Sequence, residues 1–216
     1  MNKDKPYGWK HFVVAGIGTE IGKTLISAIL VEALQADYWK PVQAGNLDET
    51  DTDFVRQHIS NDRSVFHPEG YRLEAPMSPH AAAAAEGITI NLDHLNIPAT
   101  ENTLVIELAG GLMVPLNNHQ LNIDLLKRWQ LPVILVSRNY LGSINHTLLS
   151  IEVLKQQDIR VIGIIFNGSP NAATEDFILQ YTGVPCLFRV NQQQEISPEL
   201  VMELAGGIKE QLKHYL

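Results

Sequence analysis

The chain has 216 residues, a formal net charge of −8 and a single cysteine, and its composition, 45% hydrophobic and 19% charged, is that of a globular protein. One cysteine excludes an intrachain disulfide framework and a zinc site built from several cysteines. The acidic balance argues against a general nucleic-acid or membrane-surface binder, but it does not exclude a local anion site.

The N-terminal stretch from Met1 to Lys10 carries lysines but lacks the apolar segment of a signal peptide. No run reaches about 18 apolar residues, the length expected of a membrane-spanning helix. We therefore expect one domain over residues 1–216, located in the cytoplasm and not bound to a membrane.

Short apolar runs alternate along the chain with longer segments of helical periodicity. The runs predict strands at residues 12–17, 38–42, 103–106, 132–137, 161–166 and 184–188. The segments between them predict helices at residues 24–34, 122–129, 143–156, 174–181 and 197–214. The last helix would start at Ser197 and Pro198, a pair that suits a helix N-terminus. Fully apolar strands that alternate with helices form parallel sheets covered on both faces, so we expect a three-layer α/β fold with a mostly parallel sheet.

Two long loops are expected at residues 43–52 and 64–79, and the second leads into an alanine-rich helix that Ser78 would cap and Gly87 would end. In an α/β fold, long loops at the carboxyl ends of strands are where binding sites lie. We therefore look for functional residues in and beside these loops.

The segment from Gly16 to Thr24, GIGTEIGKT, follows the first apolar run and opens the first helix. Such a glycine-rich turn is typical of a phosphate loop, because backbone N–H groups and the helix N-terminus both favour an anion. Lys23 would lie between the outer phosphates, and the Thr24 hydroxyl would coordinate Mg²⁺. The strict spacing G-x-x-x-x-G-K-[ST] fails because position 17 is Ile, so an ordinary glycine-rich turn stays the alternative. The hypothesis is a P-loop NTPase-like fold.

Two further charged residues are candidates for the same edge of the sheet. Glu107 ends the apolar run 104–106 and suits a Mg²⁺ ligand beside a phosphate loop, the alternative being an acid at an ordinary turn. Lys40 precedes Pro41, which should end the second strand there. In a dry site this lysine would stabilise developing negative charge, whereas spacing alone favours a solvated edge lysine.

An acidic cluster follows the second predicted strand. One of its carboxylates could reach Mg²⁺, and the others would be solvated loop charges. Its members are Asp48, Glu49, Asp51 and Asp53.

Several segments resemble, in order, the motifs of the dethiobiotin synthetase family. The loop GTEIGKT at 18–24 is similar to the family's G-T-[DG]-T-[ED]-[VI]-G-K-T, including its longer spacing. The other similar segments are KPVQAG at 40–45, PMSPHAA at 76–82, ELAGGLMVPL at 107–116 and LGSINHT at 141–147. Asn167 also resembles an asparagine with which the family ends its fifth strand.

This resemblance implies an ATP-dependent cyclo-ligase of biotin biosynthesis, which converts 7,8-diaminononanoate, CO₂ and ATP into dethiobiotin, ADP and phosphate. One amine takes up CO₂ as a carbamate, the γ-phosphate activates the carbamate as a mixed anhydride, and the other amine closes the ureido ring. Because carbamate and triphosphate are both anionic, Lys23, Lys40 and Mg²⁺ would neutralise the charge where they meet.

The resemblance also implies the roles of individual residues. Lys40 and Lys23 would be catalytic, and the Mg²⁺ ligands would be Thr24, Asp53 and Glu107. The residues expected to contact ATP are Thr19, Glu20, Ile21, Gly22, Lys23, Thr24, Asp53, Glu107, Leu108, Ala109, Gly110 and, near the adenine, Asn167. The residues expected to contact the other substrate are Gln43, Ala44, Gly142, Ser143 and Asn145. The last three lie at a helix N-terminus, which would hold the distal carboxylate across a homodimer interface.

The chain departs from the family pattern at two positions. Ala44 stands where many members have Ser or Thr, so Gln43 or backbone groups must replace that hydroxyl. Leu108 replaces the usual glycine after the acid, and we expect strain there if the position has a positive φ or touches the nucleotide. Phe177 is a candidate for an aromatic residue that contacts the substrate from a partner subunit.

Two other functions share features with this chain. Partitioning and septum-positioning ATPases share the expected fold, but they carry a second lysine early in the phosphate loop, and residues 16–20 contain none. Such proteins also commonly bind a membrane or DNA surface through a basic or amphipathic tail, and this sequence shows no such tail. An amidoligase acting on a corrin-like acid usually brings a glutamine-hydrolysing domain, for which this length leaves no room.

Overall fold

The computed structural model describes residues 10–212 and residue 215. Two sequence-based expectations therefore fall outside the described residues. One is the expectation that the N-terminal stretch, which includes residues 1–9, is not a signal peptide. The other is the end of the last predicted helix at His214.

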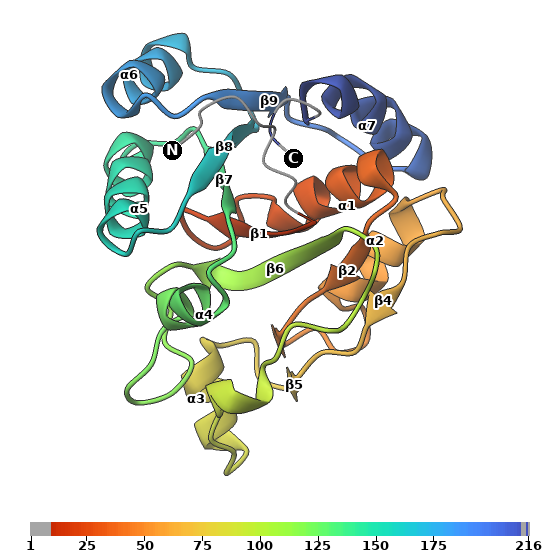
Figure 1. Cartoon of the computed structure of the whole chain (residues 1–216), viewed down its shortest axis with the longest axis vertical. Helices are drawn as coiled ribbons and strands as arrows, with labels where there is room; N and C mark the ends of the chain where they lie inside the picture. The colour runs from red at the N-terminus through yellow and green to blue at the C-terminus, as the bar shows by residue number, and fades with distance from the viewer. Residues whose placement is uncertain (1–9, 213–214, 216) are drawn as a thin grey trace.

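Within the described residues, seven strands form the main sheet in the order β4-β2-β6-β1-β7-β8-β9, and every pairing between them is parallel (Figure 1). In that order the strands are β4 (Phe66–His67), β2 (Asp37–Trp39), β6 (Leu104–Gly111), β1 (His11–Gly16), β7 (Val133–Arg138), β8 (Val161–Asn167) and β9 (Cys186–Val190). Two further strands, β3 (Val42–Ala44) and β5 (Tyr71–Leu73), pair in parallel as a separate small sheet.

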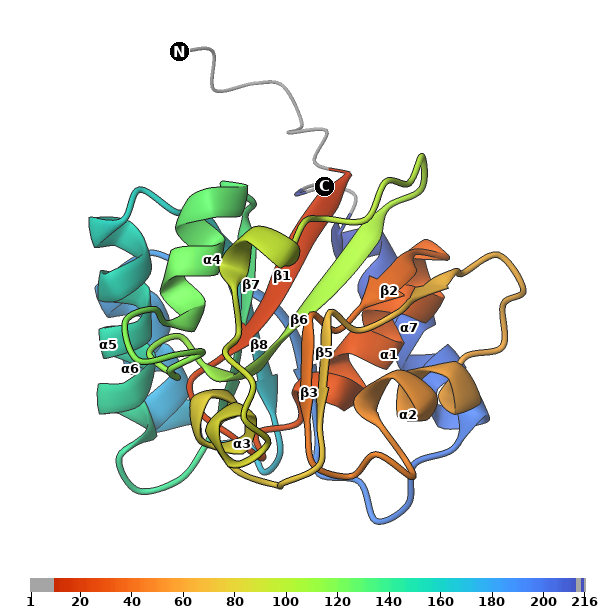
Figure 2. The ribbon, with the colours of Figure 1, turned by 90° about the horizontal axis from the view of Figure 1, so that it is seen from below.

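Helices cover both faces of the main sheet. The helices on one face are α1 (Lys23–Leu34), α2 (Asp51–His58) and α7 (Pro198–Leu212), and those on the other are α4 (Asn122–Trp129), α5 (Ser143–Gln156) and α6 (Ala172–Thr182). Helix α3 (Pro79–Ala85) lies beside the small sheet, and the 3₁₀ helix η1 (Leu92–His94) follows it (Figure 2). The predicted three-layer α/β fold with a parallel sheet is confirmed.

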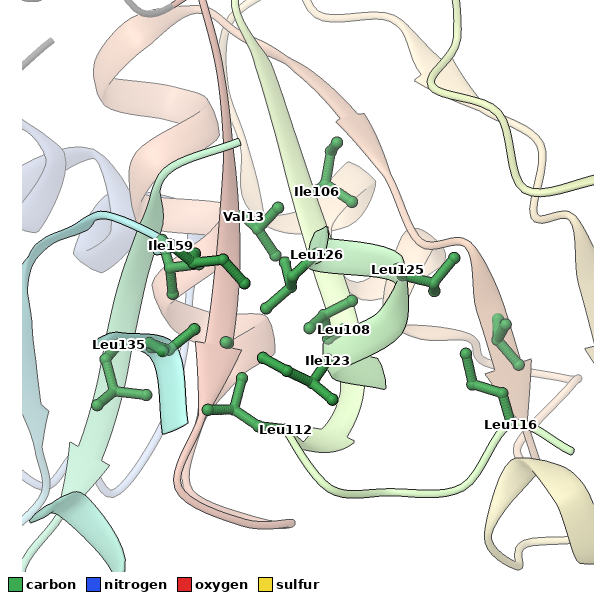
Figure 3. Packing of buried hydrophobic residues seen from close by; sticks show 14 of the residues in the cluster. Val13, Ile106, Leu108, Leu112, Leu116, Ile123, Leu125, Leu126, Leu135 and Ile159 are labelled. Carbon is green, nitrogen blue, oxygen red and sulfur yellow. The ribbon is translucent and has the colours of Figure 1, made fainter. Parts of the chain in front are cut away.

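Successive residues of β1 point into two different hydrophobic cores. Phe12 and Val14 pack in the core beneath α1 and α7, whereas Val13 and Ala15 pack in the core beneath α4 and α5. Figure 3 shows part of the second core, where Val13 lies near Leu126 of α4. A strand with both faces buried has no polar alternation, which explains why the sequence shows continuous apolar runs.

The largest differences from the predicted strands occur at two places. The strand predicted at 38–42 is divided at Lys40 and Pro41 into β2 and β3, because proline cannot donate to the ladder and the chain passes there into the small sheet. Strand β6 does not end at Glu107 but continues to Gly111, which pairs with Gly16 of β1. Glu107 is therefore held inside a strand rather than at its tip.

Helix α2 begins at Asp51, near the end of the loop predicted at 43–52 and inside the acidic cluster. Thr50 is its N-cap, and the Thr50 hydroxyl accepts a hydrogen bond from the backbone N–H of Asp53.

Within residues 10–212, no helix is both long enough and apolar enough to cross a membrane.

The buried carboxylate of Asp37, at the start of β2, connects three segments at this edge of the sheet. It accepts hydrogen bonds from the Val65 N–H at 3.0 Å, the Thr100 hydroxyl at 2.6 Å and the Asn102 amide at 3.0 Å. Burial alone would raise the pKa of Asp37, but these hydrogen bonds outweigh burial and hold the pKa below its ordinary value.

We expect Asp37→Asn to lower the free energy of unfolding by about 1–3 kcal/mol at pH 7, because it disrupts hydrogen bonds to a charged group. The folded-state pKa lies below the unfolded value of about 3.9, so this contribution is present above that pH and is lost as the pH falls through the folded pKa. Denaturant unfolding at several pH values should show the two proteins converge in acid. The exposed Asp62→Asn is the control, and a difference for Asp37→Asn that stays constant with pH would contradict the account.

Candidate active site

The glycine-rich segment predicted as a phosphate loop lies between β1, which ends at Gly16, and α1, which begins at Lys23. Two of its residues, Glu20 and Gly22, have left-handed backbone conformations, with φ of 56° and 89°. The buried Lys23 ammonium donates to the Gly18 carbonyl at 2.9 Å, so it lies over the loop. Burial lowers the pKa of Lys23 to about 8, Glu107 and Asp51 oppose the shift, and repulsion by Lys40 adds to it.

Side chains at the ends of two neighbouring strands hold the outside of this loop. Asn167 of β8 donates from its amide to the Ile21 carbonyl at 2.8 Å, and Arg138 of β7 donates to the Glu20 carbonyl at 3.2 Å. A Cβ atom on Gly22 would lie 2.1 Å from the Asn167 amide nitrogen, so only glycine fits there. The loop therefore has little room to change its conformation.

The end of β6 approaches the loop from the other side. A Cβ atom on Gly110, which has φ of +70°, would lie 2.9 Å from a Val114 methyl group and 3.4 Å from the Thr19 hydroxyl. The predicted nucleotide segments at 18–24 and 107–110 are thus side by side, and Ala109 and Gly110 line the same cavity as the loop.

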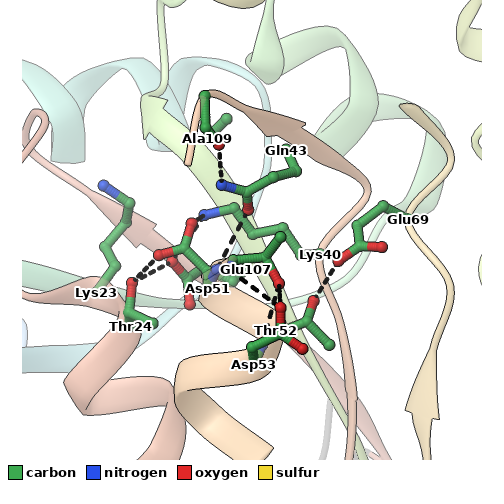
Figure 4. A network of polar contacts seen from close by, with 12 residues as sticks. Lys23, Thr24, Lys40, Gln43, Asp51, Thr52, Asp53, Glu69, Glu107 and Ala109 are labelled. Atoms are coloured by element: carbon green, nitrogen blue, oxygen red, sulfur yellow. Dashed lines mark hydrogen bonds and ion pairs between the residues drawn. The ribbon is translucent and has the colours of Figure 1, made fainter. Parts of the chain in front are cut away.

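Four polar side chains meet beside the loop, one each from α1, α2, β6 and the segment between β2 and β3 (Figure 4). The Lys40 ammonium lies 2.6 Å from Asp51 Oδ2 and 2.9 Å from Glu107 Oε1. The Thr24 hydroxyl lies 2.6 Å from Asp51 Oδ1 and 3.1 Å from Glu107 Oε1. Glu107 is 0% exposed and Lys40 is 5% exposed, so the interpretation of Lys40 as a solvated edge lysine is excluded.

The charges of this cluster support one another. Burial alone would lower the pKa of Lys40, but the carboxylates of Glu107 and Asp51 outweigh burial and raise that pKa above its ordinary value. Burial alone would raise the pKa of Asp51, and the Lys40 ammonium outweighs it and lowers that pKa. Lys40 therefore stays protonated at neutral pH and acts as a positive charge rather than as a base.

The structure brings Asp51, and not Asp53, into contact with Thr24. Asp53 accepts hydrogen bonds from the Thr50 N–H at 3.1 Å and the Thr50 hydroxyl at 2.7 Å, and it pairs with Arg56 at 2.9 Å. These contacts complete the N-terminal capping box of α2. Residues two apart on a helix do not share a face, so Asp51 and Asp53 point in different directions.

The donor set at the cluster suits a hard divalent cation. Oxygens of Thr24, Asp51 and Glu107 converge within hydrogen-bond distance, and such oxygens are the ligands that Mg²⁺ prefers. Among the residues that the structure describes, no group of three His, Cys, Asp or Glu side chains gathers in a metal-binding arrangement. A metal here would therefore be held by two carboxylates and one hydroxyl, and a bound phosphate compound or water would complete its coordination.

Two cavities open on either side of the phosphate loop. The larger, about 710 Å³, is lined by the loop, by the Lys40 cluster and, on the opposite wall, by Gln43, Ala44, Pro76, Met77 and Ser78. The smaller, about 190 Å³, is lined by Arg138, Asn167, Gly168, Gln192 and Gln193, among others. Both cavities touch Glu20 and Gly22, so an elongated ligand could cross the loop from one to the other.

Comparisons with known proteins identify the family of this chain. A family model described as an AAA domain matches residues 10–200. The "ATP-dependent dethiobiotin synthetase BioD" of Christiangramia forsetii is 49% identical over 94% of this chain and 98% of its own length. The protein of the same description from Cytophaga hutchinsonii is 49% identical over 91% of this chain and 95% of its own length. The one from Chlamydia felis is 42% identical over 93% of this chain and 94% of its own length. The chain belongs to the dethiobiotin synthetase family.

Two solved structures that share this fold are far more distant in sequence. A ParA family ATPase from Chlorobium tepidum aligns with a TM-score of 0.56 and 14% identity, over 95% of this chain and 92% of that one. The MinC:MinD cell division complex of Aquifex aeolicus gives a TM-score of 0.58 and 12% identity, over 93% and 96%. At these identities the likeness shows a shared P-loop ATPase fold and nothing of function.

Several residues expected from the dethiobiotin synthetase motifs lie away from the larger cavity. Gly142, Ser143 and Asn145 lie at the start of α5 and line neither cavity of their own chain. Leu108 is buried in the core next to α4 and has no positive φ, so the strain expected of a leucine there does not arise. Phe177 is half exposed on α6, where its ring stacks on Tyr181.

Some functional candidates were missed or left open by the sequence. Asp51 was one of four acids in the predicted cluster, and spacing could not distinguish it from the other three. The signal that could have done so is Thr50, a residue type suited to an N-cap, which places Asp51 at the first position of the helix. Tyr38, whose hydroxyl donates to Glu107 at 3.0 Å, gave no motif signal. Only the pairing of β2 with β6 brings it to the site.

We expect Gly22→Ala to weaken ATP binding by about tenfold or more, because a positive φ and a clash together cost on the order of 1–3 kcal/mol. Gly87→Ala is a matched control, since Gly87 also has a positive φ, +69°, but a Cβ there would meet nothing within 4 Å. Titration calorimetry with ATP should show weakened binding in the first variant only. Equal affinity in both variants would contradict the packing of Asn167 against the loop.

Proposed function

We propose that this chain, in keeping with its family, converts 7,8-diaminononanoate, CO₂ and ATP into dethiobiotin, ADP and phosphate on a single domain. The observation that carries this proposal is the position of Lys40. Its buried, protonated ammonium lies beside the phosphate loop and lines the same 710 Å³ cavity as Lys23, Gln43 and Ala44. A fixed positive charge between a triphosphate site and a second substrate site suits a reaction that joins two anions.

The proposed reaction begins when one amine of the substrate takes up CO₂ as a carbamate. A carbamate oxygen attacks the γ-phosphorus of ATP and the bond to the ADP oxygen breaks, which gives a mixed anhydride. The second amine then attacks the carbamoyl carbon, the ureido ring closes, and phosphate leaves. Lys23 would hold the outer phosphates, and Lys40 would neutralise the carbamate as it approaches them.

Mg²⁺ fits the oxygens of Thr24, Asp51 and Glu107, and we propose these three as its protein partners, with Asp51 in place of the expected Asp53. When bound, the ion would neutralise phosphate charge during transfer. Lys40 contacts both of these carboxylates and so holds their orientation. This shared contact would couple the lysine beside the carbamate to the residues beside the phosphates.

The remaining substrate groups have proposed places as well. We place the adenine in the smaller cavity beside Asn167 and Gln192. Gln43 lines the larger cavity and uses one of its two amide N–H groups on the Gly45 carbonyl at 2.9 Å, so its other N–H or backbone groups would replace the hydroxyl missing at Ala44. In a homodimer, a second copy would bring its α5 N-terminus to the distal carboxylate. The use of ATP and of a biosynthetic intermediate favours the cytoplasm.

Incubation with diaminononanoate, labelled bicarbonate, Mg²⁺ and ATP tests the proposal directly. The carbamate is lost in acid, whereas the ureido carbon of the product is stable, so acid-stable label reports ring closure. We expect such label to form only when all four components are present. A folded, ATP-binding preparation that forms no acid-stable label would overturn the proposed function.

We expect Lys40→Ala to lower kcat by about 10²-fold or more, the usual cost of losing a group that stabilises transition-state charge, and to lower ATP affinity far less than turnover. The exposed Lys127→Ala is the control for loss of a lysine elsewhere. Thermal unfolding must be followed alongside, because buried carboxylates that lose their cation are destabilising. Loss of nucleotide affinity in place of turnover would show that the assigned role is wrong.

A further inference from the structure

Each carboxylate oxygen of Glu107 has partners of its own. Oε1 accepts hydrogen bonds from Lys40 at 2.9 Å and from Thr24 at 3.1 Å. Oε2 faces the other way and accepts a hydrogen bond from the Tyr38 hydroxyl at 3.0 Å. Tyr38 lies in β2, is fully buried, and belongs to none of the sequence motifs that identify the site.

The strand register fixes the place of the Tyr38 ring. Tyr38 pairs with Val105 of β6 on one side and with Phe66 of β4 on the other. Glu107 lies two residues beyond Val105, so its side chain leaves the same face of the sheet, within diagonal reach of the tyrosine. The Tyr38 ring also packs at a tilt against Phe66, with centroids 6.1 Å apart. The hydroxyl is thus delivered to Glu107 from a rigid, packed support.

The carboxylate of Glu107 cannot find a replacement partner in water, because the residue is 0% exposed. If Oε2 lost its donor, the carboxylate would gain by rotating about its terminal bond to bring that oxygen toward Lys40 or Thr24. Such a rotation would displace Oε1 from the point where it meets Thr24 and Asp51. The orientation of the proposed metal-binding oxygens therefore depends on Tyr38.

We infer that Tyr38 is a positioning residue that fixes Glu107 for the divalent cation and so sets the metal affinity of the site. This inference rests on the metal role assigned to Glu107 under the proposed function. Outer partners of metal ligands typically change affinity by about 10–100-fold when they are removed. Tyr38 is fully buried and lines neither cavity, so its loss should be overcome by a higher metal concentration.

The test compares the whole wild-type chain with Tyr38→Phe, which keeps the ring and removes only the hydroxyl. The control is Tyr71→Phe, which loses a hydroxyl that accepts from the Asn91 N–H at 2.9 Å, away from the site. Mn²⁺ binding in the presence of ADP, followed by the electron paramagnetic resonance signal of free Mn²⁺, gives a readout independent of turnover. We expect about tenfold weaker Mn²⁺ binding in Tyr38→Phe and none of this effect in Tyr71→Phe.

The kinetic counterpart separates positioning from a general structural role. In Tyr38→Phe the Mg²⁺ concentration for half-maximal dethiobiotin formation should rise about tenfold, while kcat at saturating Mg²⁺ and KM for diaminononanoate stay near those of the wild type. Unchanged Mn²⁺ affinity, whether or not the melting temperature falls, would overturn the inference but leave the proposed function intact. A wild-type chain that bound no Mn²⁺ with ADP would instead overturn the metal site, and the inference with it.

Discussion

The ion pair between Lys40 and Glu107 lies almost entirely out of water, and the rest of the site is arranged around it. Removing two charges from water costs several kcal/mol each unless close contacts and hydrogen bonds compensate. Here the compensation comes from Asp51 beside the lysine and from Thr24 and Tyr38 at the two oxygens of Glu107. Because the partners come from α1, α2, β2 and β6, the ion pair forms only when these four elements pack together.

The same cluster explains how an acidic protein can bind anions. The net charge of −8 is spread over the whole chain, and at physiological salt charges further apart than about 8 Å are largely screened. Close to the phosphate loop the balance is different, since Lys23 and Lys40 face two carboxylates there, and the start of α1 adds its dipole. The lowered pKa of Lys23 and the raised pKa of Lys40 reflect their different partners at the same site. Global charge therefore says little about the ligands of this site.

The sequence was sufficient for the layers of the fold and insufficient for its small elements. Strands such as β1 are buried on both faces, so their apolar runs were visible in the sequence. The three-residue strands β3 and β5 are too short to leave a pattern, and α2 is a mostly polar helix that buries only Thr52 and Val55. The ends of such elements depend on tertiary pairing, which no local signal carries.

The site divides in the same way. The phosphate loop could be found from its motif, because its chemistry requires fixed residue types. Spacing alone favoured a solvated Lys40 and left Glu107 open, and the family resemblance is what singled out both residues. The choice between Asp51 and Asp53 depends on where α2 begins. The motif resemblance selected Asp53, which completes the capping box with Thr50, whereas Asp51 contacts Thr24. Tyr38 becomes part of the site only through strand register, which a single sequence does not specify.

If the Lys40–Glu107 pair and Asp51 together form the metal–nucleotide site, Asp51→Asn and Asp53→Asn should differ in their Mg²⁺ dependence. The measurement is the Mg²⁺ concentration that gives half-maximal dethiobiotin formation. We expect a rise of about tenfold or more for Asp51→Asn, since loss of a ligand should cost at least as much as loss of an outer partner. For Asp53→Asn we expect no change in the Mg²⁺ requirement. The weakened helix cap should only lower the free energy of unfolding, by about 1 kcal/mol. The reverse result, with the Mg²⁺ requirement shifted by Asp53→Asn alone, would show that Asp53 and not Asp51 belongs to the metal site.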